Sequence, residues 1–188
     1  MLRGLSVEAA AGACVHVAGP NGSGKTTLLR VLAGLLSPEQ GDVNWQGQPI
    51  SADREAFGAA LSYLGHSDGL KPEFSCFENL AYEVGLRRRL TASAIDSALA
   101  RVALTESREQ PARSLSAGQR RRLAMARVML AAAPLWILDE PFTNLDHAGV
   151  ERVSKIIAEH LDARGAVFIA AHQPPAIPGH TARRLEIA

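Results

Sequence analysis

Cysteine is scarce in this sequence. The 188 residues contain two, Cys14 and Cys76, which stand far apart and form neither a CxxC pair nor the spacing of a metal site. This excludes a disulfide-stapled fold and a cysteine-ligated metal centre. We therefore expect two reduced thiols in a cytosolic protein, with Cys14 in a buried strand.

Net charge, long apolar runs and a targeting segment are also missing. The formal net charge is +1, so electrostatics give no reason to expect a nucleic-acid partner. The longest apolar run, residues 128–138, is interrupted by Pro134 and falls short of the ~20 residues that cross a bilayer. The N-terminus lacks the charged, apolar and small-residue regions of a signal peptide. We expect a soluble chain, for which docking on a membrane partner remains open.

What the sequence does contain is a glycine-rich loop that matches G-x-x-x-x-G-K-[ST] at every fixed position. The loop stands between an apolar run at 14–18, predicted as a buried strand, and a predicted helix at 25–36. Its glycines let the backbone wrap an anion, and the helix N-terminus attracts phosphate. We expect Lys25 to reach the β- and γ-phosphates of a nucleoside triphosphate and Thr26 to hold Mg²⁺, although a plain glycine turn is the alternative. The residues assigned to ATP are Gly19, Pro20, Asn21, Gly22, Ser23, Gly24, Lys25, Thr26 and Thr27.

Apolar runs alternate with helical periodicity along the rest of the chain. Further strands are expected around Leu5 and Val7 and at 59–64, 135–138, 166–171 and 184–187, with a hairpin within 42–50 that turns at Gln46-Gly47. Helices are expected to open at Ser75, where Glu78 completes a capping box, and to cover 91–104, 114–129 and 147–161. The pattern predicts an α/β fold: a mostly parallel sheet covered on both faces, with a small antiparallel β portion.

The middle third of the chain is predicted to be mainly helical, whereas strands and helices alternate on either side of it. We expect one domain over 1–188, in which 1–66 and 130–188 form the α/β core and 67–129 form an inserted helical subdomain. The basic run at 87–89 fits a solvated helix end better than a binding patch.

Two carboxylates follow the predicted strand at 135–138. Side chains at the carboxyl end of such a strand project over the crevice where open α/β sheets bind ligands. We expect Asp139 to bind Mg²⁺, through a water and shared with Thr26, and Glu140 to polarise the water that attacks the γ-phosphate. Alone, the pair would indicate a plain Asp-Glu turn; beside a phosphate loop the functional interpretation is favoured.

The start of the helix expected at 114–129 contains a second motif. Leu115-Ser116-Ala117-Gly118-Gln119 opens the helix at 114–129, where Ser116 can cap and Gly118 permits close backbone approach. The segment resembles the signature Leu-Ser-Gly-Gly-Gln of ATP-binding-cassette (ABC) nucleotide-binding subunits, with Ala117 in place of the first glycine. Asp146 ends a run similar to the D-loop of that family, His172 matches its switch histidine, and His66 lies where its Q-loop glutamine is expected.

These motifs follow the order of the ABC family from residue 19 to residue 172. The resemblance implies a P-loop NTPase (RecA-like) fold and a head-to-tail homodimer that sandwiches two ATP molecules. Ser116 and Gly118 would complete the site of the partner copy, His172 would contact the γ-phosphate, and hydrolysis of ATP would be coupled to an integral membrane permease. A histidine at position 66 is a poorer Mg²⁺ ligand than an amide oxygen, so we expect coupling to be kept and metal contact to weaken.

The adenine platform of the family is missing from the sequence. Family members carry a strand and an adenine-stacking aromatic residue before the region that matches Leu5, whereas the first aromatic residue here is Trp45. Either the natural start lies upstream or the stacking is lost. We favour the first, because losing a sheet strand would expose an unpaired edge.

Within the family, the chain resembles the ATP-binding subunits of the bacterial haem exporter of cytochrome c maturation. The resemblance is carried by the segments 43–50, 64–66, 115–122, 135–143 and 172–174. It implies a peripheral subunit on the cytoplasmic face of the inner membrane, with a permease and cytochrome c maturation subunits as partners. An exporter for another substrate, such as a lipid or drug, is the runner-up, ahead of a non-transport ABC ATPase or a P-loop kinase.

Overall fold

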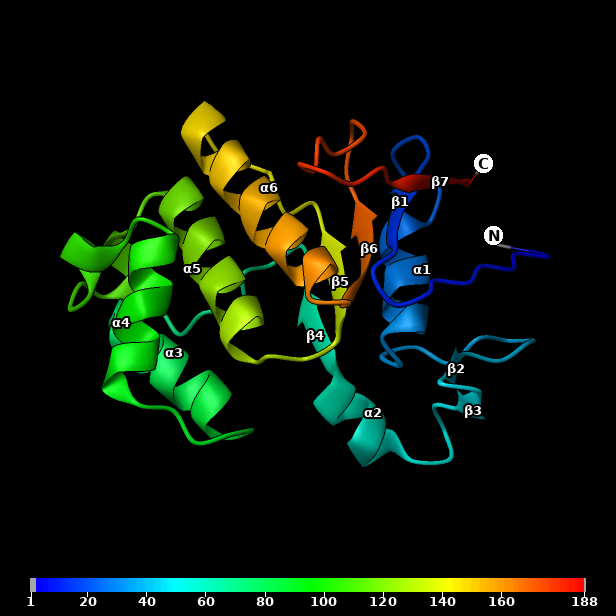
Figure 1. Cartoon of the computed structure of the whole chain (residues 1–188), viewed down its shortest axis with the longest axis horizontal. Helices are drawn as coiled ribbons and strands as arrows, with labels where there is room; N and C mark the ends of the chain where they lie inside the picture. The colour runs from blue at the N-terminus through cyan, green and yellow to red at the C-terminus, as the bar shows by residue number, and fades with distance from the viewer. Residues whose placement is uncertain (1–2, 188) are drawn as a thin grey trace.

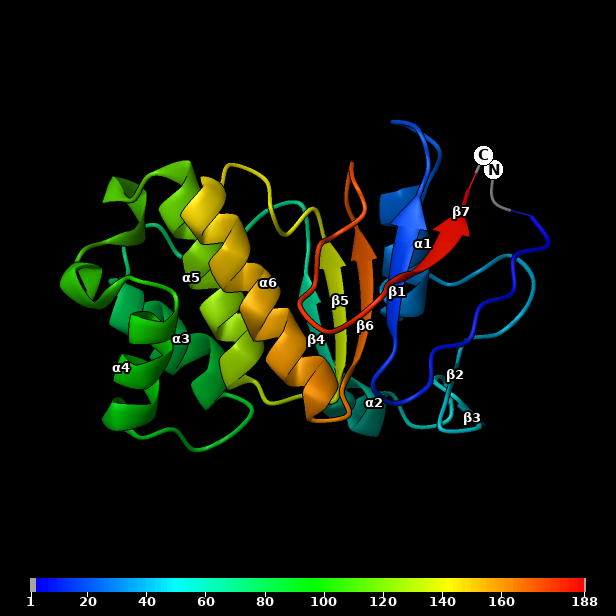
Figure 2. The same ribbon diagram turned by 45° about the horizontal axis from the view of Figure 1, so that its top comes forward.

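Five parallel strands form the main sheet of the computed structural model, which describes residues 3–187. Their order is β4-β5-β6-β1-β7, as seen from one side to the other in Figure 2. The strands are β1 (Cys14–Ala18), β4 (Leu61–Leu64), β5 (Leu135–Asp139), β6 (Ala166–Ala170) and β7 (Arg183–Glu186). A small antiparallel pair, β2 (Asn44–Trp45) and β3 (Gln48–Pro49), lies apart from this sheet. The predicted α/β class, with a parallel sheet and an antiparallel portion, is confirmed.

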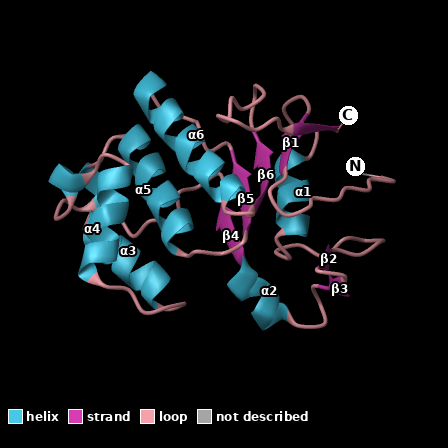
Figure 3. Ribbon diagram, viewed as in Figure 1, coloured by secondary structure: helices cyan, strands magenta, loops and turns pink. Residues whose placement is uncertain are grey.

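Helices cover both faces of the sheet, as Figures 1 and 3 show. On one face lie α1 (Lys25–Leu32) and α2 (Arg54–Ala60), and on the other lies α6 (His147–Asp162). Beyond the β4 edge, α3 (Cys76–Gly85) and α4 (Ala92–Arg101) pack against α5 (Ala117–Leu130). Two 3₁₀ turns, η1 (Thr105–Ser107) and η2 (Ala112–Ser114), precede α5.

The continuous apolar runs of the strands follow from this two-sided burial. On β5, Leu135 and Ile137 face the cluster under α1, whereas Trp136 and Leu138 face the cluster under α5 and α6. That second cluster also takes in α3 and α4 without a break. The helices of 67–129 therefore share a core with the sheet, and their division into a subdomain stays a prediction.

The local signals for caps and turns are confirmed. Ser75 and Glu78 form a capping box, with the Ser75 N–H donating to Glu78 Oε2 at 2.8 Å. Thr91 caps α4. The hairpin turns at Gln46 and Gly47, both with positive φ, as a two-residue turn between twisted strands requires.

Several predicted boundaries were wrong: the helix expected at 91–104 ends at Arg101, and the helix expected at 114–129 begins at Ala117, after a 3₁₀ turn. The helix after the glycine loop ends at Leu32, not at residue 36, because Gly34 takes a φ of +67° and stops it; Leu35 is left 58% exposed. Residues 59 and 60 belong to α2, a helix that the sequence analysis missed and whose N-cap is Asp53.

The strand expected around Leu5 and Val7 was also wrong. These side chains pack on the β1 side of the core, yet their backbone pairs with no strand in the described part of the chain. The alternation of apolar and polar residues there reflects packing of one side of the segment on the core, which does not require hydrogen bonds to a neighbouring strand.

Both cysteines are free and buried, as expected for structural thiols. Burial raises the pKa of Cys14 and of Cys76 to about 11. Since the thiolate is the reactive form, both side chains should react slowly while the protein is folded. Within residues 3–187, none of the helices is both long and apolar enough to cross a membrane.

Candidate functional site

The glycine-rich loop connects β1 to α1 at the carboxyl end of the sheet. Gly24 takes a φ of +99° immediately before the first turn of α1, a backbone conformation that residues other than glycine rarely adopt. A Cβ at Gly19 would lie 2.3 Å from the Ile187 carbonyl oxygen, so only glycine fits there. The backbone of the loop is thus shaped by glycines at the positions that the sequence pattern fixes.

The Lys25 side chain extends back toward the start of this loop. Its side chain is almost fully buried, and Nζ donates hydrogen bonds to the carbonyl oxygens of Gly19 and Pro20, both at 2.8 Å. Ser23 Oγ is buried and has no partner among the described residues. The first amides of α1 lack partners within the helix, as in any helix. The loop therefore concentrates one ammonium group and several donors at the positive end of a helix dipole, which suits a phosphate chain.

The loop meets the strand-end carboxylates directly. Thr26 Oγ1 donates a 2.8 Å hydrogen bond to Asp139 Oδ2, across 113 residues of sequence. Asp139 is the last residue of β5 and is 2% exposed. The fold thus brings the two residues expected at Mg²⁺ within hydrogen-bond distance of each other.

Glu140 has an unusual backbone. Its φ is +54°, a left-handed conformation that costs energy for a residue with a side chain. Its N–H donates to the Ala170 carbonyl at 2.8 Å, which ties it to the end of β6. Its Oε1 lies 3.8 Å from His172 Nε2, and the His172 side chain is 66% exposed. Glu140 and His172 therefore face each other beside Asp139.

Oxygen donors at this place fit Mg²⁺. No cluster of three or more His, Cys, Asp and Glu side chains within 3–187 is arranged to hold a metal ion. Mg²⁺ in a nucleoside triphosphate site needs no such cluster, because phosphate oxygens and waters supply most of its ligands. One hydroxyl and one carboxylate, Thr26 and Asp139, are the hard donors that it takes from protein.

The signature segment lies elsewhere. Leu115 is buried, whereas Ser116 is exposed and forms a capping box with Gln119, whose Oε1 accepts from the Ser116 N–H at 2.8 Å. Ala117 and Gly118 open α5. In the part of the chain that the structure describes, no hydrogen bond or ion pair joins 115–119 to the phosphate loop. Within one copy, these two groups of predicted site residues are not brought together.

Asp146 and His66 also have exposed side chains. Asp146 is the N-cap of α6, with Oδ1 accepting from the Gly149 N–H at 2.8 Å. His66 follows Gly65 at the end of β4. Neither forms a hydrogen bond with the phosphate loop among the described residues.

Two further residues, which were not among the predicted site residues, support the site. His16 Nε2 donates to the Ala171 carbonyl at 3.0 Å and so fixes the chain just before His172. Arg121 is 3% exposed and binds the backbone at the carboxyl ends of β4 and β5. A polar residue inside an apolar strand was the signal for His16. For Arg121 it was the helical spacing with Met125 and Val128, which are buried.

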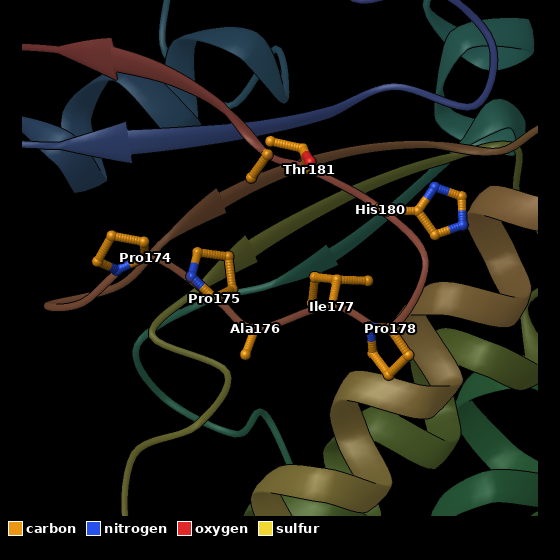
Figure 4. A pocket seen from close by; sticks show the side chains of 8 residues that line it. Pro174, Pro175, Ala176, Ile177, Pro178, His180 and Thr181 are labelled. Atoms are coloured by element: carbon orange, nitrogen blue, oxygen red, sulfur yellow. The ribbon is translucent and has the colours of Figure 1, made fainter.

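The cavity in Figure 4 is separate from these residues. The proline-rich segment between β6 and β7 lines it, with a volume of about 400 Å³, and none of the predicted ATP residues is among its lining residues. His180 Nε2 lies 2.9 Å from Asp162 Oδ1 and holds the segment to the end of α6. The cavity is thus a feature of this connection and lies outside the phosphate site.

The close packing of Gly118, in the signature segment, against Asn144 can be tested by substitution. A Cβ at Gly118 would lie 2.6 Å from the Asn144 carbonyl oxygen, a backbone atom that cannot move aside cheaply. We expect Gly118→Ala to lower the free energy of unfolding by about 1–3 kcal/mol, as overpacking does. Chemical denaturation measures this change.

A matched control exists in α2. A Cβ at Gly58 meets nothing within 4 Å. Gly58→Ala should raise the free energy of unfolding by about 0.5–1 kcal/mol, the usual helix-propensity difference. If both variants were stabilised alike, the close packing of Gly118 on Asn144 would be refuted.

Comparisons with known proteins agree with this geometry. The family model described as ABC transporter matches residues 2–143. The cytochrome c biogenesis ATP-binding export protein CcmA of Nitrosococcus oceani is 48% identical over 179 residues, covering 94% of this chain and 80% of the relative. The protein of the same name from Yersinia pestis is 41% identical over 184 residues, covering 98% of this chain and 84% of the relative.

Solved structures show the same fold. A putative ABC transporter ATP-binding protein from Pyrococcus furiosus superposes with a TM-score of 0.85 at 25% identity, covering 97% of this chain and 88% of that one. A dimeric ATP-binding cassette bound to ADP and phosphate superposes with a TM-score of 0.81 at 21% identity, covering 89% of this chain and 78% of that one.

Proposed function

Because this chain belongs to the ABC transporter family, within the group of cytochrome c biogenesis ATP-binding export proteins, we propose that it drives the export of haem. It is an ATPase subunit of a transporter. The proposal of haem export is carried by the names of these relatives, and the nucleotide site is supported by the 2.8 Å hydrogen bond from Thr26 to Asp139, which joins the phosphate loop to the strand-end carboxylates.

The phosphate chain of ATP would lie along Gly19 to Thr27. Lys25 would exchange its two carbonyl partners for β- and γ-phosphate oxygens, and loop amides and Ser23 Oγ would donate to the phosphates. Thr26 and Asp139 would hold Mg²⁺, which when bound neutralises charge on the phosphates. These residues position and stabilise charge, which is most of what phosphoryl transfer requires.

Glu140 is the proposed general base. Its carboxylate lies 3.8 Å from His172, and Glu140 follows the carboxyl end of β5 just as the phosphate loop follows the carboxyl end of β1. The carboxylate would accept a proton from the attacking water, and His172 would contact the γ-phosphate. The strained φ supports this role, because such strain is kept where the surroundings enforce it and is concentrated at functional sites.

The site is complete only in a dimer. Ser116 and Gly118 lie apart from the phosphate loop of their own copy, so in a head-to-tail homodimer they would face the ATP of the partner copy. Leu115, Ala117 and Gln119 shape this helix start, and Asp146 would lie at the interface. His66 would take part in coupling to the permease. ATP would then close the dimer before hydrolysis.

The names of the relatives support a proposal about the export partners. Proteins 41–48% identical over nearly the whole chain are named as cytochrome c biogenesis ATP-binding export proteins. We infer a peripheral subunit on the cytoplasmic face of the bacterial inner membrane, associated with an integral permease and cytochrome c maturation subunits. The haem itself would be handled by those partners.

Deletion of the gene in its bacterium tests the export function. Periplasmic c-type cytochromes, counted by haem staining, should be lost and should return when the wild-type gene is restored from a plasmid. A gene carrying Lys25→Ala should not restore them, whereas one carrying Lys155→Ala, a change of an exposed lysine on α6, should. Normal cytochrome maturation in the deletion strain would refute the role in haem export and favour another transported substrate.

A further inference from the structure

Arg121 is a buried charge with an unusual set of partners. It lies on the second turn of α5 and is 3% exposed. Its Nη2 donates to the carbonyl oxygens of Asp139 and Glu140, the latter at 2.9 Å. Its Nη1 donates to the Gly65 carbonyl and to Asp68 Oδ1, both at 3.0 Å. One guanidinium therefore clamps the carboxyl ends of two neighbouring strands, β4 and β5.

The neighbouring arginines bind differently. Arg120 donates to the Leu115 carbonyl within its own helix start, at 2.6 Å. Arg122 donates to carbonyls at the end of α4, including that of Ala103 at 2.9 Å. Arg121 alone of these three reaches the strand ends. Its planar fork is what allows one side chain to serve two strands.

The clamp acts on the strained residue of the site. Three hydrogen bonds hold Glu140 at its positive φ: its N–H donates to the Ala170 carbonyl, and its own carbonyl accepts from Arg121 and, at 3.2 Å, from the Thr143 N–H. Without Arg121, the Glu140 carbonyl keeps only the Thr143 N–H as donor, so the peptide after Glu140 can rotate more easily toward an ordinary conformation and displace the carboxylate. A shift of about 1 Å in a reacting group can cost about 100-fold in rate.

The other half of the clamp lies on a different segment. Gly65 immediately precedes His66, and Asp68 is an ionic partner whose side chain is one-quarter exposed. A displacement of residues 65–68 therefore pulls on the same guanidinium that holds Glu140. These hydrogen bonds offset the burial of the Arg121 charge through Nη1 and Nη2, whereas its buried Nε has no partner among the described residues.

We propose that Arg121 is a positioning residue that holds Glu140 in its hydrolytic geometry and makes that hold depend on the segment 65–68. This rests on the proposed role of Glu140 as general base. Through this clamp, a partner that moves the segment around His66 changes the rate of hydrolysis without touching the nucleotide.

Arg121→Lys is the informative variant, because lysine keeps the charge but cannot reach two strands at once. We expect kcat for ATP hydrolysis to fall about 10- to 100-fold, while the Kd for ATP changes less than about 3-fold. Arg122→Lys, the same change one residue further on, should leave both values within about 2-fold. Thermal unfolding reports whether each variant is folded.

A second measurement separates positioning from mere support of the fold. In the Glu140→Gln background there is no carboxylate left to position, so Arg121→Lys should cost less than about 2-fold more. Asp68→Ala, at a partly exposed position, should also lower kcat. In the double variant with Arg121→Lys, it should reduce kcat little further. It keeps the test available even where Arg121→Lys reduces stability.

The inference is overturned if Arg121→Lys costs the same factor with and without Glu140, or if the Kd for ATP worsens in proportion to kcat. It is also overturned if kcat matches that of Arg122→Lys. The proposed function fails differently: Glu140→Gln would then turn over ATP at the wild-type rate, whatever residue stands at 121.

Discussion

Glu140→Gln is expected to bind ATP normally and to hydrolyse it about 100- to 10 000-fold more slowly than the wild-type protein, the range that a general base contributes. Glutamine has the shape of glutamate, so the backbone with its φ of +54° and the contact with the Ala170 carbonyl should persist. Its amide cannot accept a proton from water. Phosphate release measures turnover, and equilibrium binding of ATP measures affinity.

The same variant should collect in the closed dimer. With ATP bound and hydrolysis blocked, size-exclusion chromatography should show a dimer with ATP and a monomer without it. Glu151→Gln, at an exposed glutamate on α6, should hydrolyse ATP normally. Turnover by Glu140→Gln within about 3-fold of wild type would contradict its role as base.

Ser116→Ala should abolish hydrolysis while leaving ATP binding to the isolated monomer nearly unchanged. Among the described residues of one copy, Ser116 forms hydrogen bonds only within its own helix start, so we expect its effect on the nucleotide to come from a second copy. Loss of its cap also costs about 1 kcal/mol of stability. The rate effect must therefore be separated from the loss of the cap.

Ser75→Ala supplies that separation. Ser75 and Ser116 form equivalent capping boxes at the starts of α3 and α5. Ser75→Ala should lose a similar amount of stability and keep its ATPase rate. Mixing Ser116→Ala with Lys25→Ala should restore activity, because a mixed head-to-tail dimer contains one intact site. Equal rate losses in Ser75→Ala and Ser116→Ala would show that only the cap matters.

The sequence predicted most of the phosphate site because its parts are local. Gly19 to Thr27 carries strand, glycine loop and helix start in one stretch, and Asp139 with Glu140 ends an apolar strand. Parallel strands bring such carboxyl ends to one edge of a sheet, so the contact of Thr26 with Asp139 follows from topology.

Tertiary contacts could not be predicted in the same way. In the sequence, Arg121 is one of three consecutive arginines. Only the packing of α5 against β4 brings its side chain to Gly65 and Glu140. The positive φ of Glu140 is set by contacts from two other elements and leaves no mark in composition. Leu35 fitted the helical periodicity, but Gly34 ended the helix first.

In the proposed head-to-tail dimer, the phosphate loop of one copy meets the signature segment of the other. Cross-linking tests it most directly, because native Cys14 and Cys76 are buried and leave engineered cysteines to react. Asn21→Cys and Ser116→Cys are placed on separate copies in the Glu140→Gln background, mixed, and treated with a short bis-maleimide. A head-to-tail dimer should give a cross-link between the two different variants when ATP and Mg²⁺ are present, and none without nucleotide. Cross-links that form only between identical variants, or equally without ATP, would contradict it.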